Sequence, residues 1–422
     1  MSMPMSWGDI NNNLCKSADK YKFYFGTYSF DDFGKGSIAK RLPVSTVGWG
    51  SRAVEMRSNK TTFDCFENDE LKLTEVAERY HVYDAVNRVK EDILVAGCGF
   101  IGLVGDRVLP FTAEEASGLF DWRDQNLSFG AAKFSNKTKQ KGIATYNEPA
   151  DYMIYEKDVT RSKRAEDKEE TIYPNPTGRP LMGLLTYRST VKRPFGNSVL
   201  NAAARSAIID ASRTTRQAMI SAYYYNSKVD VILGADADTE LERIETQTGD
   251  ILKLSPNENG QNPSIGEFAQ HAMTPFTDTI LIAARNFCTA TKLVLSNLGI
   301  SSDAPQSPEA LEIVSDDLRD DISQWHHDLG EQIKYFCLTL FMYENGLSRV
   351  DDNIMKKYNA TIPVFKPTYR SDVSKVGDGI FKLAEKAPGV LLSRSLWRNL
   401  GLDSQDINIA IQSALDNPNL PL

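Results

Sequence analysis

The sequence predicts an α+β fold made of several parts, and three observations support this. Residues 198–225 contain no proline or glycine and are rich in Ala, Arg, Ile and Met, which favours one long helix. Between Ser307 and Gly346, apolar residues recur every three or four positions, which predicts a second and longer helix. Residues 228–266 alternate short apolar runs with turn residues, as is typical of short strands. The length of 422 residues favours two or three domains.

The N-terminal part is predicted to combine one helix with several strands. Residues 1–60 are mixed in character and carry many turn signals. A helix is expected from Asp69 to about Asp92, where apolar residues follow a helical spacing. Short strands are expected over residues 93–112 and 116–156. Lys157 to Glu170 is expected to be a solvated hairpin tip or surface loop, and residues 171–180 are expected to be a proline-rich connection.

Capping residues set the expected ends of two further helices. Asn197 or Ser198 is expected to cap the helix over 198–225, which at 1.5 Å per residue would be about 40 Å long. Thr274 followed by Pro275 predicts a helix that runs to about Thr291. After residue 361, one strand (TIPVFKP) is expected before two or three short helices in DGIFKLAEKA, SRSLWRNLG and SQDINIAIQSALDN.

The longest predicted helix begins at Ser307-Pro308, and Gly330 inside it is compatible with a break. If unbroken, this helix would be about 57 Å long. Its continuous apolar stripe would need neighbours on either side, which a ring of subunits could supply. Its other face is expected to be solvated and acidic, and it carries Glu309, Glu312, Asp316, Asp317, Asp320, Asp321, Asp328 and Glu331.

Composition argues against several classes of protein. The chain has 48 Lys and Arg against 56 Asp and Glu, a net charge of −8 and a pI near 5.3. An acid excess argues against a protein that wraps nucleic acid, because neutralising phosphates needs a basic face. The five cysteines and four histidines form no disulfide or zinc pattern, which favours a reducing compartment. Neither a signal peptide nor an 18-residue apolar run is found in the sequence.

One glycine motif suggests a nucleotide-binding alternative. Gly97, Gly99 and Gly102 in GCGFIG match the G-x-G-x-x-G spacing of dinucleotide-binding turns. Such a turn needs a helix that opens at the third glycine and points its N-terminus at the pyrophosphate. Here the residues that follow Gly102 read as strand and turn. A glycine-containing β-hairpin is therefore the favoured interpretation.

Other catalytic motifs are missing from the sequence. It contains no G-x-x-x-x-G-K-[ST] P-loop, no G-x-S-x-G, no HExxH and no EF-hand loop. We therefore expect a protein that is not an enzyme and has no catalytic residue, cofactor or metal site.

The order of the expected elements resembles the portal proteins of tailed bacteriophages, most closely the siphovirus-type portal family. Residues 194–238 are similar to the family block in which a long helix is followed by tyrosine and a hydrophobic strand that ends in Leu-Gly. Residues 288–313 are similar to the block between the stem and the long wing helix, with Thr291-Lys292-Leu293-Val294 where the family has Thr-Gly-x-Pro. Residues 361–407 are similar to the C-terminal segment of the family.

The resemblance implies a portal fold with wing, stem, clip and crown, assembled into a ring of about twelve subunits. The implied parts, in chain order, are the N-terminal wing (1–196), a stem helix (197–227), the clip (228–266), a second stem helix (267–292), the tunnel loop (293–306), the long wing helix (307–346) and the C-terminal wing edge and crown (347–422).

The resemblance also implies function and partners. The ring would sit at one vertex of the capsid and conduct double-stranded DNA, without sequence preference, during packaging and ejection. The implied protein partners are the large terminase, head–tail connector or adaptor proteins, and the major capsid and scaffolding proteins, with no membrane involved. The implied location is the virion portal vertex, with the host cytoplasm during assembly.

Candidate contact residues follow from these assignments. Those for the DNA channel and tunnel loop are Lys292, Ser296, Asn297, Ser301, Ser302, Arg205, Arg213 and Arg216, and an ion pair is the alternative role for each arginine. Those for clip docking are Asp236, Asp238, Glu240, Asn257 and Asn259. In this setting an acid excess is compatible with a channel wall along which DNA slides without sticking.

Two alternatives to a portal remain open. One is another virion structural protein, such as a capsid-forming or nucleic-acid-coating subunit. The other is a nucleotide-binding enzyme that uses Gly97, Gly99 and Gly102.

Overall fold

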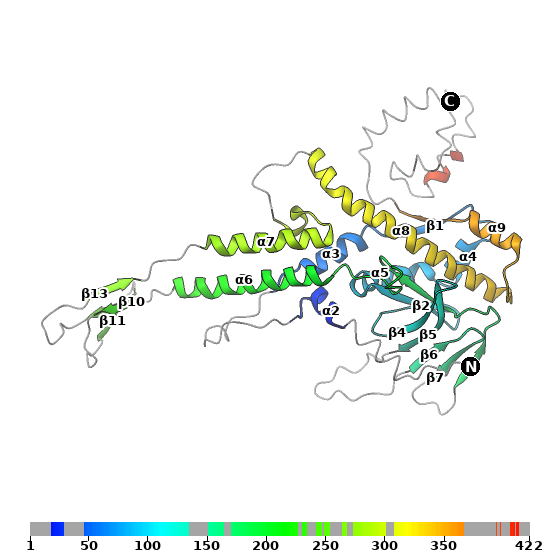
Figure 1. The fold of residues 1–422 in the computed structure, drawn as a ribbon, viewed down its shortest axis with the longest axis horizontal. Coiled ribbons are helices and arrows are strands. Elements are labelled where there is room, and N and C mark those ends of the chain that lie inside the picture. Colours follow the sequence, from blue (N-terminus) through cyan, green and yellow to red (C-terminus); the bar gives the residue numbers. More distant parts are fainter. Residues whose placement is uncertain are drawn as a thin grey trace, which may run out of the picture. The chain divides into compact units, whose positions relative to one another are not determined.

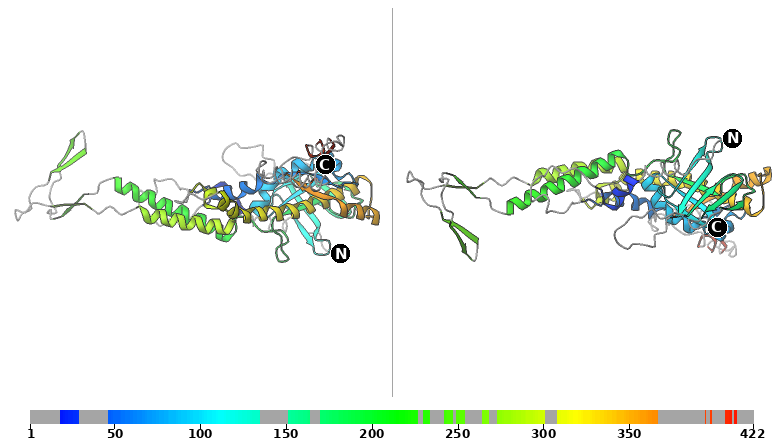
Figure 2. Two further views of the ribbon diagram at one scale, coloured as in Figure 1. Left: turned by 90° about the horizontal axis from the view of Figure 1, so that it is seen from above. Right: turned by 90° about the horizontal axis from the view of Figure 1, so that it is seen from below.

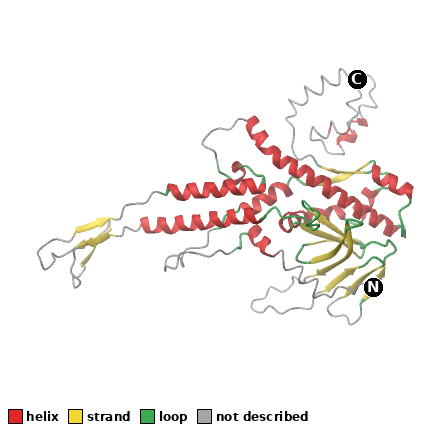
Figure 3. Cartoon of the chain, in the orientation of Figure 1, coloured by secondary structure: helices red, strands yellow, loops and turns green. Residues whose placement is uncertain are grey.

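The computed structural model describes residues 18–28, 46–134, 151–163, 170–226, 230–233, 242–246, 249–253, 264–267, 273–300 and 308–366, with a few residues between 394 and 412. The chain is α+β and divides into two compact units. The first unit is Met1–Tyr28, Gly48–Arg205 and Phe287–Leu422, and the second is Ser29–Val47 and Ser206–Asn286. Figure 3 distinguishes the helices from the strands.

Among the described residues, the first elements of the first unit are two helices, in the segment where the sequence showed turn signals. These are α2 (Ala18–Phe25) and α3 (Trp49–Ser58), and α2 packs on α3. The short strand β1 (Phe63–Glu67) follows. Neither helix has a long apolar repeat in the sequence, so neither could be predicted by periodicity.

The single helix expected from Asp69 to Asp92 is in fact two helices, α4 (Leu73–Arg79) and α5 (Val82–Ala96). The break lies at His81, whose backbone is left-handed with a φ of 57°. Asp69 caps α4, because its carboxylate accepts hydrogen bonds from the backbone N–H groups of Leu73 and Thr74 at 2.8 and 2.7 Å. The expected strand start at residue 93 is also wrong, because α5 continues to Ala96.

A three-stranded antiparallel sheet follows, in the order β3 (Arg107–Phe111), β2 (Cys98–Val104) and β9 (Met182–Thr186). The favoured interpretation of GCGFIG is confirmed, since β2 pairs with β3 as a hairpin. A Cβ on Gly99 would come within 2.5 Å of Val89 in α5, and a Cβ on Gly102 within 2.7 Å of the Tyr155 hydroxyl. These glycines therefore allow close packing, and no helix opens at Gly102.

The second sheet is a five-stranded antiparallel meander that reaches further along the chain than expected (Figure 1). Its strands are β4 (Ala116–Asp121), β5 (Asn126–Phe134), β6 (Asp151–Tyr155), β7 (Val159–Lys163) and β8 (Thr171–Pro174). Two predictions are wrong in part. Strand β7 lies within the expected loop at 157–170, and strand β8 lies within the expected connection at 171–180. Strand β7 carries charged residues, and β8, at the edge of the sheet, ends in proline, so neither shows the apolar alternation by which strands are predicted.

The first unit is layered, with helices, then the three-stranded sheet, then the five-stranded sheet. Gly99 and Gly183 face the helices, because added Cβ atoms would meet Val89 of α5 and Phe336 of the long helix described below. Gly130 of β5 lies against Met182 of β9, which places the meander on the other face. The core therefore lies on both faces of the three-stranded sheet.

The second unit is described chiefly by two long helices and two small two-stranded sheets. One end of each helix belongs to the first unit. The helices are α6 (Ala202–Asn226) and α7 (Thr274–Thr291), which run alongside each other (Figures 1 and 2). Between them, β10 (Asp230–Leu233) pairs with β13 (Ser264–Glu267), and β11 (Glu242–Thr246) pairs with β12 (Gly249–Lys253). The prediction of two helices around a β-rich segment is therefore confirmed for the described residues.

The cap of α6 differs from the expected one. Asn201, rather than Asn197 or Ser198, precedes the helix, and its side-chain oxygen accepts the backbone N–H of Ala204 at 2.9 Å. This is the hydrogen bond of an N-cap residue. Ser198 instead donates its hydroxyl to the carbonyl of Val95 at 2.6 Å, which fastens the approach to α6 onto α5.

The long predicted helix is confirmed as α8 (Pro308–Glu344), and it is continuous through Gly330, a point that the sequence left open. A side chain at Gly330 would collide with Pro363, within 2.7 Å, in β14 (Ile362–Phe365). This strand, predicted as TIPVFKP, pairs with β1. Before it lies α9 (Asp352–Ala360), which the sequence analysis did not identify.

The apolar stripe of α8 is covered within the chain itself. Its buried side chains from the middle of the helix onward are Leu318, Ile322, Trp325, Leu329, Ile333, Phe336 and Leu340. They pack against β9, α4 and β14. From Leu318 onward, the expectation that neighbouring subunits cover this stripe is therefore wrong, while the side chains of its earlier positions, Leu311 and Val314, lie outside the described part of the chain. In the part of the chain that the structure describes, no helix has the length and apolarity to cross a membrane.

Candidate functional site

The segment that joins α7 to α8 is the candidate site, because the sequence analysis placed its loop nearest to DNA. Residues 273–300 are described, so the end of α7 and the first part of the loop can be built up residue by residue. The 3₁₀ turn η2 (Leu295–Leu298) lies within this loop.

Helix α7 ends because Lys292 adopts a left-handed backbone conformation with a φ of 55°. The backbone N–H of Leu293 then bonds back to the carbonyl of Cys288 at 3.1 Å, and the Leu293 side chain is buried. This is the six-to-one hydrogen bond of a Schellman motif, in which glycine is the usual left-handed residue. The portal block has glycine at this place, so Lys292 occupies a position that favours glycine.

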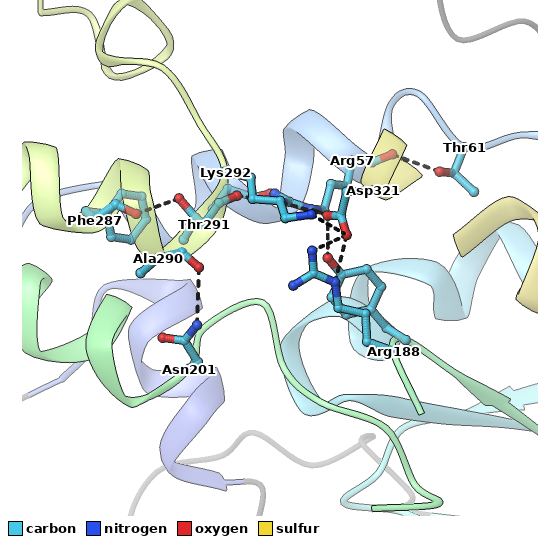
Figure 4. A network of polar contacts seen from close by, with 11 residues as sticks. Arg57, Thr61, Arg188, Asn201, Phe287, Ala290, Thr291, Lys292 and Asp321 are labelled. Carbon is cyan, nitrogen blue, oxygen red and sulfur yellow. Dashed lines mark hydrogen bonds and ion pairs between the residues drawn. The ribbon is translucent and has the colours of Figure 1, made fainter. Parts of the chain in front are cut away.

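A buried carboxylate lies beside this helix end (Figure 4). Asp321 of α8 is only 5% exposed, although the sequence analysis placed it on a solvated acidic face. One of its oxygens, Oδ2, accepts hydrogen bonds from Arg57 Nε at 3.0 Å and from the Tyr187 hydroxyl at 2.6 Å. The other, Oδ1, accepts Arg188 Nε at 2.7 Å and lies 4.0 Å from Lys292 Nζ. We call this group the Asp321 hub.

Arg57 extends the hub to the end of α7. This side chain is 1% exposed and lies on α3. Its Nη2 donates to the carbonyl of Thr291 at 2.5 Å, and its Nη1 donates to the carbonyl of Ala53 at 3.0 Å. An unpaired carbonyl of the last turn of α7 is thereby capped by a side chain from a distant part of the sequence.

The root of α6 and the loop are fastened to the same region. Asn201 donates its side-chain N–H to the carbonyl of Ala290 at 3.2 Å, which ties the start of α6 to the last turn of α7. Arg52 of α3 donates Nε to the carbonyl of Asn297 at 3.0 Å, which holds η2. Polar contacts with α3 therefore hold the end of α7 and the turn η2, and a further contact holds the start of α6 to α7.

Electrostatics explains why a buried carboxylate is stable in the hub. Burial raises the pKa of Asp321, but Arg57, the Tyr187 hydroxyl and Arg188 outweigh burial and hold the pKa below its ordinary value. Asp321 therefore stays ionised at neutral pH, and arginine does not lose its proton there. A permanently charged cluster without a nucleophile is suited to holding structure and unsuited to acid–base chemistry.

The residues predicted to contact DNA are distributed as follows. Lys292 is in the hub with its side chain 40% exposed, Ser296 is exposed, and Asn297 accepts the Val294 N–H on its side chain at 3.3 Å. Arg205 lies over the Phe23 ring at 5.8 Å.

The other predicted contact residues are buried or not described. Arg213 is half-buried and Arg216 is 8% exposed, so a DNA contact from Arg216 would need its side chain to move. Ser301, Ser302 and the clip candidates Asp236, Asp238, Glu240, Asn257 and Asn259 lie outside the described residues.

The sequence analysis missed the three residues that build the hub around Asp321. Arg57, Tyr187 and Arg188 are separated from Asp321 by 264, 134 and 133 positions. No local motif connects them.

Metal and nucleotide sites were also sought. Across the described residues, no group of three His, Cys, Asp or Glu side chains is placed to hold a metal ion. The dinucleotide alternative lacks its helix, because Gly99 and Gly102 lie inside β2.

Comparisons with known proteins give little further guidance. No family model matches the chain, and no curated protein matches it. Among solved structures, it is similar to a chain from the neck of a native GTA particle computed with C12 symmetry, with a TM-score of 0.49 and 11% identity. That match covers 90% of this chain and 97% of the other.

Proposed function

We propose that this chain is a phage portal protein, which forms a ring at one capsid vertex through which double-stranded DNA is packaged and ejected. The observation that carries the proposal is the order α6, four short strands, α7, a short loop and α8. This order matches the stem, clip, stem, tunnel loop and wing helix that the sequence resemblance implies.

The Asp321 hub also supports the proposal. A loop that contacts moving DNA must be anchored to a rigid part of the protein, so that the residues at its two ends stay in place. Arg57 and Asn201 fix the last turn of α7, and Arg52 fixes η2. In this role Lys292 and Ser296 present polar, partly exposed groups for weak and sequence-independent contacts with phosphates.

The proposal includes the partners of such a ring. Terminase and then head–tail connector proteins would dock on the clip, and the major capsid and scaffolding proteins would contact the wing. In this role the chain is not an enzyme and needs no cofactor, because the packaging motor is a separate protein.

Electron microscopy and mass measurement of the purified full-length chain test the proposal. Closed rings of about twelve subunits are the expected result. A protein that stays monomeric under all conditions, or forms open arrays, would overturn it. Open arrays or nucleic-acid-coated filaments would favour another kind of virion subunit.

A loop deletion tests the conduit itself. Shortening residues 296–304 should leave ring assembly intact and impair DNA packaging, because the hub that fixes the loop base is untouched. Normal packaging by this variant would show that the segment is not a tunnel loop.

A further inference from the structure

The Asp321 hub carries more positive than negative charge. Its three cations, Arg57, Arg188 and Lys292, all pair with the single carboxylate of Asp321 (Figure 4). Among the residues that the structure describes, no second acid pairs with any of them. Arg57 is buried and directs its two Nη atoms at backbone carbonyls. The excess charge therefore lies on Arg188 and Lys292, whose side chains are 41% and 40% exposed.

Both exposed cations keep hydrogen-bond donors for a ligand. Arg188 contacts Asp321 through Nε and Nη2, and no described residue bonds to its Nη1. Lys292 Nζ lies 4.0 Å from Oδ1 of Asp321, which is an ion pair but too long for a hydrogen bond, so its three N–H bonds remain available. Because Arg188 Nε lies 2.7 Å from the same oxygen, the two cationic groups are near neighbours, and one phosphate group can contact both.

The backbone holds both cations in place. Arg188 and Lys292 are non-glycine residues with left-handed backbones, at φ values of 50° and 55°. Such strain is costly and is concentrated at functional sites. The Asn197 side chain donates to the carbonyl of Arg188 at 2.7 Å, and the buried Leu293 side chain fixes the turn after Lys292. The two cations are therefore preorganised, which lowers the entropy cost of binding a ligand.

A tight hairpin after Arg188 adds further cations. Thr190 and Arg193 exchange backbone hydrogen bonds at 3.1 and 2.8 Å, which places Lys192 at the tip. Lys192 and Arg193 are both exposed. Burial lowers the pKa of Lys20 most, and Arg205 and Arg193 lower it further, so these three cations are close enough to repel one another. Cations gathered on one part of a chain whose net charge is −8 are typical of a surface that binds a polyanion.

We propose that Arg188 and Lys292 form a clamp for a phosphate group of the DNA backbone, with Lys192 and Arg193 as additional contacts. The proposal rests on the proposed conduit function and deepens it, because it adds Arg188, which sequence reasoning did not select, to Lys292. A DNA backbone is favoured over an acidic protein because it offers a regular row of charges to several separate cations. So few phosphate contacts give weak, salt-dependent binding that does not read the sequence.

Titration of the full-length chain into a labelled short DNA duplex, followed by fluorescence anisotropy, tests the clamp. Arg188→Gln and Lys292→Gln should each weaken binding roughly tenfold at about 50 mM salt, because each removes one phosphate contact. Each should also reduce the slope of log affinity against log salt concentration by about 1, equally for duplexes of different sequence. Lys356→Gln, which removes an exposed cation from α9, is the matched control and should change neither quantity. Wild-type affinity and slope in both clamp variants would overturn the proposal.

Folding is separated from binding by the second variant, because Arg188 also holds Asp321. Lys292→Gln leaves both oxygens of Asp321 occupied by other donors, so its melting temperature should stay near that of the wild type. If Arg188→Gln does not fold, Lys292→Gln decides the question. Weaker DNA binding at an unchanged melting temperature supports the clamp, and wild-type binding refutes it.

Competition identifies the chemistry of the ligand. Unlabelled duplex should displace the labelled duplex far better than polyglutamate does at the same concentration of charge. Equal displacement would assign the site to an acidic protein segment and overturn the DNA assignment.

Electron microscopy of the same samples tests the portal separately. Rings whose DNA binding does not depend on Arg188 and Lys292 would overturn the clamp alone. Subunits that form no ring but bind DNA through these two residues would overturn the portal and leave the phosphate site standing.

Discussion

Asp321 and Asp92 are two aspartates in similar local settings whose pKa values move in opposite directions. Each accepts a hydrogen bond from a tyrosine hydroxyl, at 2.6 Å from Tyr187 and at 2.9 Å from Tyr21. Each is removed from bulk water by the fold. Yet the pKa of Asp321 lies below its ordinary value, whereas that of Asp92 is raised to about 6.

The sign of the neighbouring charges makes the difference. Three cations face Asp321: Arg57 from α3, Arg188 from the second position after β9, and Lys292 from the end of α7. Asp92 instead faces carboxylates. Burial disfavours the ionised form of both aspartates. Only at Asp321 do neighbouring cations offset this cost. One carboxylate is therefore fixed in its charged form, while the other can respond to pH.

The largest expected effect comes from removing the charge of Asp321. Asp321→Asn leaves Arg57 buried without a counter-ion, which should cost about 3–5 kcal/mol of unfolding free energy at pH 7. Urea unfolding followed by tryptophan fluorescence measures this, because Trp325 packs edge-on against Tyr187 at 5.7 Å. Because the folded pKa of Asp321 is lowered, the deficit should shrink as the pH falls below the ordinary aspartate range.

Asp320→Asn is the matched control for the hub. Asp320 is the preceding residue on α8 and is exposed. Its loss should change the unfolding free energy by no more than about 0.5 kcal/mol. Equal effects of the two substitutions would show that the hub contributes nothing beyond surface charge.

The opposite result is expected at Asp92. Asp92→Asn removes a charge that burial and neighbouring carboxylates disfavour, so it should stabilise the fold at pH 7 by about 1–3 kcal/mol. Because the folded pKa is raised, this gain should vanish as the pH falls from about 6 toward 4. Melting curves of wild type and variant at pH 7 and pH 4.5 measure it, and a loss of stability at pH 7 would contradict the comparison.

The smallest effect concerns Lys292, the most weakly held cation of the hub. Arg57, Tyr187 and Arg188 already occupy both oxygens of Asp321, so losing Lys292 leaves the carboxylate satisfied. Lys292→Gly also removes the strain of a left-handed non-glycine residue. It should therefore be more stable than Lys292→Ala, which keeps the strain, by about 1 kcal/mol.

Unfolding curves of the two Lys292 variants, measured side by side, make this comparison. Since neither variant has the lysine side chain, a glycine variant less stable than the alanine variant would show that left-handed strain at position 292 does not limit stability.

Much of the fold could be predicted from local patterns. Helices α6, α7 and α8 could be predicted because their signals lie in neighbouring residues. These signals are capping residues and long stretches of residues that favour a helix or repeat at helical spacing. Strand β2 and the hairpin in GCGFIG followed for the same reason. Strands β7 and β8 were missed, because β7 is rich in charged residues and the edge strand β8 ends in proline, so neither carries an apolar alternation.

The sequence by itself determined the α+β class, the long helices and the β-rich segment between α6 and α7. Tertiary structure alone decided which acids on these helices are buried. Asp320 and Asp321 are adjacent and chemically identical, yet one is exposed and the other is buried against Arg57. The physical reason is that burial of a charge depends on its partners in space, and the three side chains that donate hydrogen bonds to Asp321 lie more than 100 positions away along the chain.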